Sequence, residues 1–248
     1  MQPTKGKLYL IPTGLGSENL LEVIPSQVNS IIASIDHYIV ENEKSARKFI
    51  KQIAPKKQQS KLVIYTTDKH RKNQSFEEEL SHCEQGISIG LFSDAGAPGI
   101  ADPGASAVGL AHKLNIPVVP IVGSSSILLA MMASGLNGQN FAFNGYLPIK
   151  SPERKDAIKQ LERKSKEINQ SQLFIETPYR NNQFLNDLKQ LLSSKTMLCV
   201  ASNITMPDEF IKTKTIQQWK RIEVDLHKKP TIFIIHSYNI DTNRRFNQ

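Results

Sequence analysis

Short apolar runs alternate with amphipathic stretches along most of the 248-residue chain. The apolar runs end in glycine, proline or small polar residues, as buried strands do where the chain enters a loop. After one of them, Ala46, Phe49, Ile50 and Ile53 recur at the spacing of one helix face. A chain in which strands alternate with helices is expected to form an α/β fold. The predicted strands are residues 7–12, 37–40, 62–65, 89–92, 117–122, 173–176, 197–201, 210–216 and 230–235.

The stretch from Ile89 to Gly104 carries the strongest sign of a ligand site. Its apolar run ends abruptly in Ser93 and Asp94, then passes through small residues, three glycines and two prolines before a helical pattern resumes at Ala107. Small molecules bind to such loops at the carboxyl ends of strands in open α/β sheets, because glycine lets a ligand approach the backbone. The pattern therefore predicts a binding loop with Asp94 at the edge of the sheet.

Two further strand ends have similar loops. The first strand runs into a glycine-containing turn, residues 12–16, and the fifth into Gly123 and three serines. These serines precede a helix, residues 127–133, which is apolar on nearly every side and is therefore expected to be buried, with Gly135 ending it. Hydroxyls and N–H groups at a helix start suit a carboxylate or a ribose, although an ordinary serine N-cap gives the same sequence.

A domain boundary is predicted where aromatic residues alternate with glycine before Pro148 and Pro152. We expect an amino-terminal α/β domain over residues 1–147, a carboxyl-terminal α/β domain over 148–240 and a basic tail over 241–248. The first helix of the second domain, residues 153–168, carries six lysines and arginines on its polar faces. This basic face fits phosphate contact and a solvated helix equally well.

Composition favours a polyanionic partner. The chain has 31 Lys plus Arg against 23 Asp plus Glu, a formal charge of +8, which promotes nucleic-acid binding or merely solubility. Its two cysteines, Cys83 and Cys199, lie far apart without metal-ligand spacing, so we expect neither a disulfide nor a metal site. No stretch is long enough to span a bilayer. A soluble cytoplasmic protein is expected.

Three segments resemble motifs of one known family. Residues 93–104 resemble the SDAGxPxxxDPG signature of the tetrapyrrole (corrin/porphyrin) methylase superfamily, particularly its branch that methylates the RNA of the small ribosomal subunit. Residues 141–148 resemble the family's Phe-x-Phe-x-Gly-Phe-Leu-Pro crossover, and 176–180 its Glu-Ser-Pro-His-Arg segment. The resemblance implies the class III fold of S-adenosylmethionine-dependent methyltransferases, two α/β domains with the cofactor cleft between them.

The resemblance also implies the site residues. The cofactor is S-adenosyl-L-methionine, and the product S-adenosyl-L-homocysteine. A carboxylate touching the sulfonium would oppose methyl transfer, so Asp94 is expected to organise its loop or to bind the amino-acid or ribose part. The residues expected at the cofactor are Pro12, Asp94, Ala95, Gly96, Ala97, Ser124, Ser125, Ile175, Ser202, Asn203, Pro230 and Thr231.

A ribose hydroxyl nucleophile requires a proton acceptor, for which Glu41, His70 and Glu176 are candidates. Each has another explanation. Glu41 fits a solvated helix start, and His70 lies in a charged loop where an exposed histidine is common. For Glu176, as for Arg180, an ion pair between the two domains is the other explanation.

The main hypothesis is an enzyme that methylates the ribose 2′-oxygen of a cytidine in small-subunit ribosomal RNA. Two segments depart from that branch: residues 41–44 read Glu-Asn-Glu-Lys in place of Glu-Asp-Thr-Arg, and residues 202–206 lack its Arg-Glu pair. A methyltransferase for a small molecule or another macromolecule, and a noncatalytic RNA-binding paralogue, therefore remain as alternatives. The expected partners are RNA or the small ribosomal subunit, no membrane, and a second copy in a homodimer.

Overall fold

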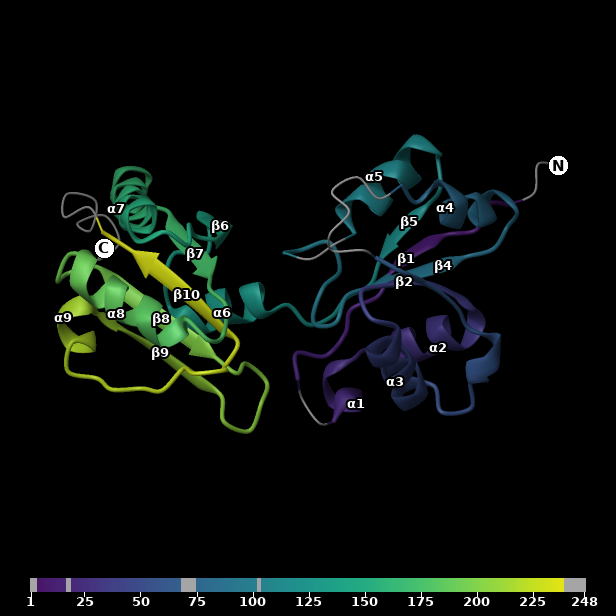
Figure 1. Ribbon diagram of the computed structural model, residues 1–248, viewed down its shortest axis with the longest axis horizontal. Coiled ribbons are helices and arrows are strands. Elements are labelled where there is room, and N and C mark those ends of the chain that lie inside the picture. The colour runs from purple at the N-terminus through teal and green to yellow at the C-terminus, as the bar shows by residue number, and fades with distance from the viewer. Residues whose placement is uncertain (1–3, 17–18, 68–74, 102–103, 239–248) are drawn as a thin grey trace, which may run out of the picture. The chain divides into compact units, whose positions relative to one another are not determined.

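The computed structural model describes the chain apart from residues 1–3, 17–18, 68–74, 102–103 and 239–248 (Figure 1). The chain divides into two compact units, Met1–Ser125 and Ser126–Gln248. This boundary lies earlier than the one expected after residue 147. The reason is that β6 (Phe141–Tyr146) pairs with β7 (Ser171–Ile175), and α6 (Ser126–Ser134) packs on the same sheet.

The first unit is built on a parallel sheet in the order β3-β2-β4-β1-β5. Because these strands are parallel, their carboxyl ends meet at one edge of the sheet, where the loops of the predicted site begin. The strands are β1 (Leu8–Leu10), β2 (His37–Val40), β3 (Val63–Thr66), β4 (Ile89–Phe92) and β5 (Val118–Pro120). The helices are α1 (Leu20–Val23), α2 (Ser26–Ser34), α3 (Glu43–Ile53), the short 3₁₀ helix η1 (Gln59–Lys61), α4 (Glu77–Glu84) and α5 (Ala105–Lys113).

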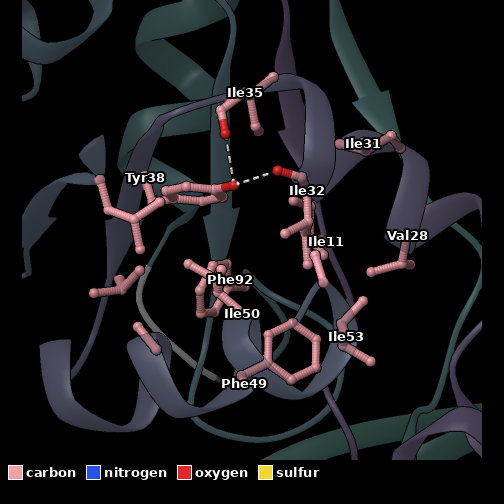
Figure 2. Packing of buried hydrophobic residues seen from close by; sticks show 14 of the residues in the cluster. Ile11, Val28, Ile31, Ile32, Ile35, Tyr38, Phe49, Ile50, Ile53 and Phe92 are labelled. Atoms are coloured by element: carbon pink, nitrogen blue, oxygen red, sulfur yellow. Dashed lines mark hydrogen bonds between the residues drawn. The ribbon is translucent and has the colours of Figure 1, made fainter. Parts of the chain in front are cut away.

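Apolar side chains cover both faces of this sheet. Along β2, Tyr38 points into the cluster beneath α2 and α3, whereas Ile39 points into the cluster beneath α4 and α5, as successive residues of a strand do. Figure 2 shows the first cluster, in which Phe49 and Phe92 pack together. The buried Tyr38 hydroxyl donates hydrogen bonds to the carbonyl oxygens of Ile32 and Ile35, at 3.1 and 2.8 Å. Its polar atom is therefore satisfied within the core.

The second unit has a mixed sheet in the order β6-β7-β10-β8-β9. The pair β6 and β7 is parallel, and the other pairs are antiparallel. Its core surrounds Trp219, whose indole N–H donates to the Leu198 carbonyl oxygen at 2.8 Å. The remaining elements are α7 (Ser151–Ile168), α8 (Asn181–Leu191), β8 (Met197–Ser202), β9 (Phe210–Thr215), α9 (Ile216–Trp219) and β10 (Thr231–His236).

The α/β fold and the alternation of strands and helices are confirmed, and β9 lies at the edge of its sheet. The expectation that the helix over residues 127–133 is buried on all sides is wrong. Within α6, Ile127 and Met131 are buried, but Leu128 and Met132 are 54% and 78% exposed. The helix packs against its sheet through one face only.

Candidate functional site

The loops after β1 and β4 are joined by hydrogen bonds at the carboxyl edge of the first sheet. The backbone N–H of Thr13 donates to the Gly96 carbonyl oxygen at 2.9 Å, and its buried hydroxyl donates to the Ser93 carbonyl oxygen at 3.2 Å. The Ser93 hydroxyl in turn donates to the Ala95 carbonyl oxygen at 3.2 Å. These bonds fix the first residues of the predicted binding loop against the end of β1.

The loops after β1 and β5 also touch, and they do so because residue 123 is glycine. A Cβ atom at this position would lie 2.2 Å from Cγ of Pro12, closer than any side chain tolerates. At Gly96 the backbone has φ of +77°, and a Cβ there would lie 3.6 Å from the Ser124 carbonyl oxygen. The structure therefore brings Pro12, Gly96 and Ser124 together, with Ala95, Ala97 and Ser125 next to them in the chain.

Asp94 connects the same edge to the start of α3. Its Oδ1 atom accepts a 2.6 Å hydrogen bond from the Ser45 hydroxyl, and its backbone N–H donates to Oε1 of Glu41 at 3.2 Å. Asn42 caps α3 by accepting a hydrogen bond from the Ser45 N–H at 3.1 Å. Two of the predicted site residues, Glu41 and Asp94, are thus in direct contact although 53 positions separate them.

A cavity of about 330 Å³ opens beside this contact. One wall comes from the loop after β1, another from α3 and a third from the end of β4. Among the residues that were expected at the cofactor, Asp94 lines it, whereas Pro12, Gly96 and Ser124 do not. The lining residues are Thr13, Gly14, Gly16, Leu20, Ser45, Ala46, Lys48, Phe49, Gln52, Phe92, Ser93 and Asp94.

In the second unit, five of the residues expected at the cofactor lie at one edge of the sheet. Thr231 at the start of β10 is paired with Ser202 at the end of β8, and its hydroxyl donates to the Ser202 hydroxyl at 3.0 Å. The Asn203 N–H donates to the Pro230 carbonyl oxygen at 2.9 Å. Ile175, at the end of β7, faces Ile232 across the same edge.

Asn203 is held in an unusual conformation by its neighbours. Its backbone has φ of +49°, and its side-chain amide donates to both carboxylate oxygens of Asp208 at 2.9 Å. Hydrogen bonds from Lys229 and then from Asn203 lower the pKa of Asp208 below its ordinary value. Because the amide nitrogen must face Asp208, the Asn203 Oδ1 atom points away from it, buried and without a partner among the described residues. This edge therefore contains a buried acceptor that no donor among the described residues satisfies.

Glu176 forms an ion pair with Arg180 within the second unit. The Arg180 Nη2 atom lies 2.6 Å from Oε1 of Glu176, and the Thr177 N–H donates to the same oxygen at 2.6 Å. The pair connects the end of β7 to the start of α8. A turn of four residues explains it: the spacing from Glu176 to Arg180 allows the contact without help from another domain.

His70, the remaining candidate for proton transfer, lies outside the described residues. Among the described His, Cys, Asp and Glu side chains, no group of three or more could hold a metal ion. The helices of the described part of the chain include none that is long and apolar enough to cross a membrane.

Sequence reasoning missed Thr13 and Ser45. Both are small polar residues in turns, where such residues are common for local reasons. Their site contacts reach across 83 and 49 positions of the chain, to Gly96 and Asp94. The one local indication of Ser45 was Asn42, because Asn42 caps α3 and so places Ser45 in the first turn of that helix.

Comparisons with known proteins agree with the motifs. Residues 7–220 match the family described as Tetrapyrrole (Corrin/Porphyrin) Methylases. The chain is 27% identical over 234 residues to Ribosomal RNA small subunit methyltransferase I of Vibrio cholerae, covering 93% of this chain and 77% of that protein. It is 30% identical over 212 residues to the protein of the same name from Synechocystis sp., covering 86% and 72%.

Solved structures share the fold at low identity. The methyltransferase CobJ superposes with a TM-score of 0.60 over 94% of each chain, at 14% identity. The cobalamin biosynthetic enzyme cobalt precorrin-4 methyltransferase, CbiF, gives a TM-score of 0.58 at 14% identity, covering 93% of this chain and 94% of that one. These two likenesses concern the fold alone.

Proposed function

Because this chain belongs to the tetrapyrrole (corrin/porphyrin) methylase family and is an S-adenosylmethionine-dependent methyltransferase, we propose that it methylates the RNA of the small ribosomal subunit. The expected target is the ribose 2′-oxygen of a cytidine. The observation that carries the proposal is the contact of the loops after β1, β4 and β5 at one edge of the first sheet. The names of the relatives then supply the class of acceptor.

The residues at this edge fit the methyl donor. Gly96 and Gly123 let the three loops pack closely together, and the exposed Asp94 carboxylate beside them can accept from an amino group or a ribose hydroxyl. Among the described residues, the Ser124 hydroxyl makes a single hydrogen bond, at 3.5 Å to the Val23 carbonyl oxygen, so a ligand can compete for it. We assign the methyl donor to Pro12, Asp94, Ala95, Gly96, Ala97, Ser124 and Ser125 in this unit.

In the second unit, the acceptor left unused on Asn203 supports the assignment of Ser202, Asn203, Pro230 and Thr231 to the same ligand. A buried acceptor without a donor costs about 1–3 kcal/mol, so a ligand N–H or O–H that reaches it gains a strong contact. Ile175 belongs to this edge through its place at the end of β7.

When bound, the donor supplies a methyl group on a positively charged sulfur, and this methyl group is transferred in line to a nucleophile. The protein contributes mainly by holding the reacting groups in place. Ser45 draws Oδ1 of Asp94 toward α3 at 2.6 Å and so fixes the direction of the carboxylate. A carboxylate that stabilised the sulfonium directly would oppose the loss of its positive charge during transfer. Asp94 avoids this cost if it orders its loop and does not touch the sulfur.

A ribose hydroxyl must also lose a proton, and Glu41 is the candidate best placed for this role. It touches the Asp94 loop and lies at the end of β2, at the same edge as the cavity. Glu176 is placed less well, because its Oε1 atom already accepts from Thr177 and Arg180. His70 remains a candidate by its place in the sequence.

A methyltransferase for a small molecule is the second candidate. It is favoured by the segment Ser202–Met206, which lacks the charged pair that the RNA-methylating branch carries at this place. In this structure, the segment is a turn in which Asn203 and Thr205 have positive φ. Such a turn supplies polar groups to a small ligand, and it offers no charge to RNA.

Transfer of labelled methyl from S-adenosylmethionine to small ribosomal subunits tests the proposal. The subunits come from cells that lack the gene for this protein, and the Asp94→Ala variant is the control. Label in the RNA that requires Asp94 supports the proposal and lets the nucleotide be mapped. A protein that binds S-adenosylhomocysteine but labels no RNA would favour the second candidate. A folded protein that does not bind S-adenosylhomocysteine would fit a noncatalytic RNA-binding paralogue.

The proposal also covers the location of the protein in the cell and its oligomeric state. An enzyme that modifies ribosomal RNA is expected in the cytoplasm, and the family resemblance implies a homodimer. Analytical ultracentrifugation at micromolar concentration checks the oligomeric state, with a mass of about twice 27.8 kDa expected.

A further inference from the structure

A row of three lysines runs along the outer side of α3. Lys44, Lys48 and Lys51 follow one another at i, i+4 and i+7, so they share one side of the helix. The opposite side is the buried one, formed by Ala46, Phe49, Ile50 and Ile53. At a rise of about 1.5 Å per residue, the row extends for about 10 Å. All three lysines are exposed.

The fold itself explains only the last lysine of this row. Lys51 lies in the last turn of α3, where a positive charge is favourable, but Lys44 lies in the first turn, where it is unfavourable. Lysines at i and i+4 also repel each other, at about 0.2–0.5 kcal/mol. The neighbouring Glu43 forms its ion pair with Arg47 at 2.8 Å. Within the described part of the chain, none of the three lysines has an ion-pair partner.

One lysine of the row, Lys48, lies at the cavity beside Asp94. Lys48 lines the cavity together with Ser45 and Gln52, which lie on the same side of α3. Leu20 and Phe49 give the cavity an apolar wall, and Asp94 gives it a carboxylate. A volume of about 330 Å³ lies in the range of small-ligand pockets and is large enough for one nucleoside.

We propose that Lys44, Lys48 and Lys51 bind consecutive phosphates of the substrate RNA, so that the nucleotide to be methylated enters the cavity beside Asp94. This inference rests on the proposed function and adds to it the surface that holds the RNA. An unpaired row of cations suits a sugar–phosphate chain, because each lysine can replace a condensed counterion. The cavity is lined by α3 and by Asp94, whereas Pro12, Gly96 and Ser124 are not among its lining residues.

The test compares two double variants with equal loss of charge in the same unit. Lys44→Gln with Lys48→Gln removes the part of the row that the fold does not explain. Lys56→Gln with Lys61→Gln removes two exposed lysines beyond the carboxyl end of α3, where they line a separate groove. Binding of a fluorescent single-stranded RNA of mixed sequence is followed by anisotropy between 50 and 200 mM salt. Binding of S-adenosylhomocysteine is measured by calorimetry.

The first double variant should lose about 1.4 from the slope of log affinity against log salt, because each phosphate contact on a single strand contributes about 0.7. Over the fourfold range of salt, wild-type affinity should fall about sevenfold more than that of this variant. The second double variant should keep the wild-type slope. Both should bind S-adenosylhomocysteine within about twofold of the wild-type affinity, which also shows that they are folded.

Four results would overturn the inference. An unchanged slope in the first variant would remove the row from the RNA surface, and an equal loss in the second would show that only net charge matters. Weaker binding of S-adenosylhomocysteine by the first variant, which keeps its fold by circular dichroism, would assign the cavity to the methyl donor. Wild-type protein that binds no RNA would overturn the proposed function as well, so the two failures are distinguishable.

Discussion

Ser45 and Asp94 meet through a 2.6 Å hydrogen bond from the serine hydroxyl to Oδ1 of the aspartate. The bond joins the first turn of α3 to the loop after β4, and it does not depend on the cap of that helix. Asn42 accepts its capping bond from the Ser45 backbone N–H, which any residue at position 45 supplies. The Ser45 hydroxyl also lies 3.0 Å from the Asn42 carbonyl oxygen, and its shorter contact is the one that orients the carboxylate of Asp94.

We expect Asp94→Ala to weaken binding of S-adenosylhomocysteine about tenfold or more, since a hydrogen bond to a charged group is worth about 1.5–3 kcal/mol. Ser45→Ala should weaken it less, by about threefold to tenfold, because the carboxylate remains but loses its direction. If Ser45 acts only through Asp94, the double variant should bind no worse than Asp94→Ala alone. Calorimetry measures all three constants. Unchanged affinity in Asp94→Ala would show that the donor binds elsewhere.

The contact between Gly123 and Pro12 predicts a second effect on the same loops. In Gly123→Ala, the new methyl group would lie 2.2 and 2.3 Å from two carbons of the rigid proline ring, so one loop must move. We expect a loss of about 1–3 kcal/mol in the free energy of unfolding of the first unit, with weaker binding of S-adenosylhomocysteine.

Gly109→Ala is the matched control, because nothing lies within 4 Å of a Cβ built there and the residue is inside α5. Alanine is the better helix former, so this variant should gain about 0.5–1 kcal/mol. Urea unfolding followed by circular dichroism measures both variants. Equal stability of the two would mean that the loops after β1 and β5 do not need a glycine at position 123.

Strands were predictable because both sheets bury their central strands in continuous apolar runs, and β4 has the bounds that its run indicated, Ile89–Phe92. The ends were harder to predict. Pro12 lacks the N–H that a strand needs, and β1 stops at Leu10. The exposed side of α6 could not be predicted, since Leu128 and Ile127 look alike until the sheet selects one of them.

The binding loop was predictable for a different reason. Its order of small residues, glycine and proline is unusual, so Asp94 and Gly96 could be singled out without the fold. Thr13 and Ser45 could not, because their partners are more than 45 positions away and only the parallel sheet brings them together. The lysine row of α3 was visible in the sequence, but its place beside the cavity was not.

Arg154 differs from the other basic residues of α7 because it forms a nearly buried ion pair with Asp187. Its nitrogen and oxygen atoms lie 2.7 Å apart, and both side chains are nearly buried, at 12% and 11% exposure. Arg154→Ala would leave the Asp187 carboxylate without its main partner, so we expect a loss of about 3 kcal/mol in the second unit.

Arg163→Ala is the comparison on the same helix. Its pair with Glu167 is 3.5 Å long and largely exposed, at 75% and 61%, so the change should cost less than about 0.5 kcal/mol. The single tryptophan of the chain, Trp219, is buried in the core of this unit. Its fluorescence during urea unfolding therefore reports the second unit. Similar losses in the two variants would contradict the difference in burial.

His236 makes the stability of the second unit depend on pH. The ring is fully buried, its Nδ1 atom lies 3.1 Å from the Ser171 hydroxyl, and burial lowers its pKa below the ordinary value of 6.5. As pH falls below about 6.5, the unfolded chain takes up a proton before the folded one does. The free energy of unfolding should therefore fall, by up to about 1.4 kcal/mol per pH unit, until the folded pKa is reached.

Above pH 7 this contribution is complete and constant. His236→Gln removes the group, so its unfolding free energy should depend less on pH between 6.5 and 5 than that of the wild type. Urea unfolding followed by Trp219 fluorescence at pH 7.5, 6.5 and 5.5 gives the comparison. Parallel curves for the two proteins would show that the buried ring is not the group that titrates.

The roles of Glu41 and Glu176 can be distinguished by replacing each of them with glutamine. Glutamine at position 41 still offers Oε1 to the Asp94 N–H, 3.2 Å away in the wild type, but it cannot take up a proton. If Glu41 accepts the ribose proton, Glu41→Gln should slow methyl transfer about 100-fold or more while S-adenosylhomocysteine binds as before.

In Glu176→Gln, Arg180 and the Thr177 N–H lose a charged acceptor, so the second unit should become less stable. Its rate per folded enzyme should stay within about tenfold of the wild type, since Glu176 acts in the fold. Single-turnover labelling of small subunits gives the rates, and Trp219 fluorescence gives the stability. The opposite result, a fast Glu41→Gln and a slow but stable Glu176→Gln, would move the proton acceptor to the second unit.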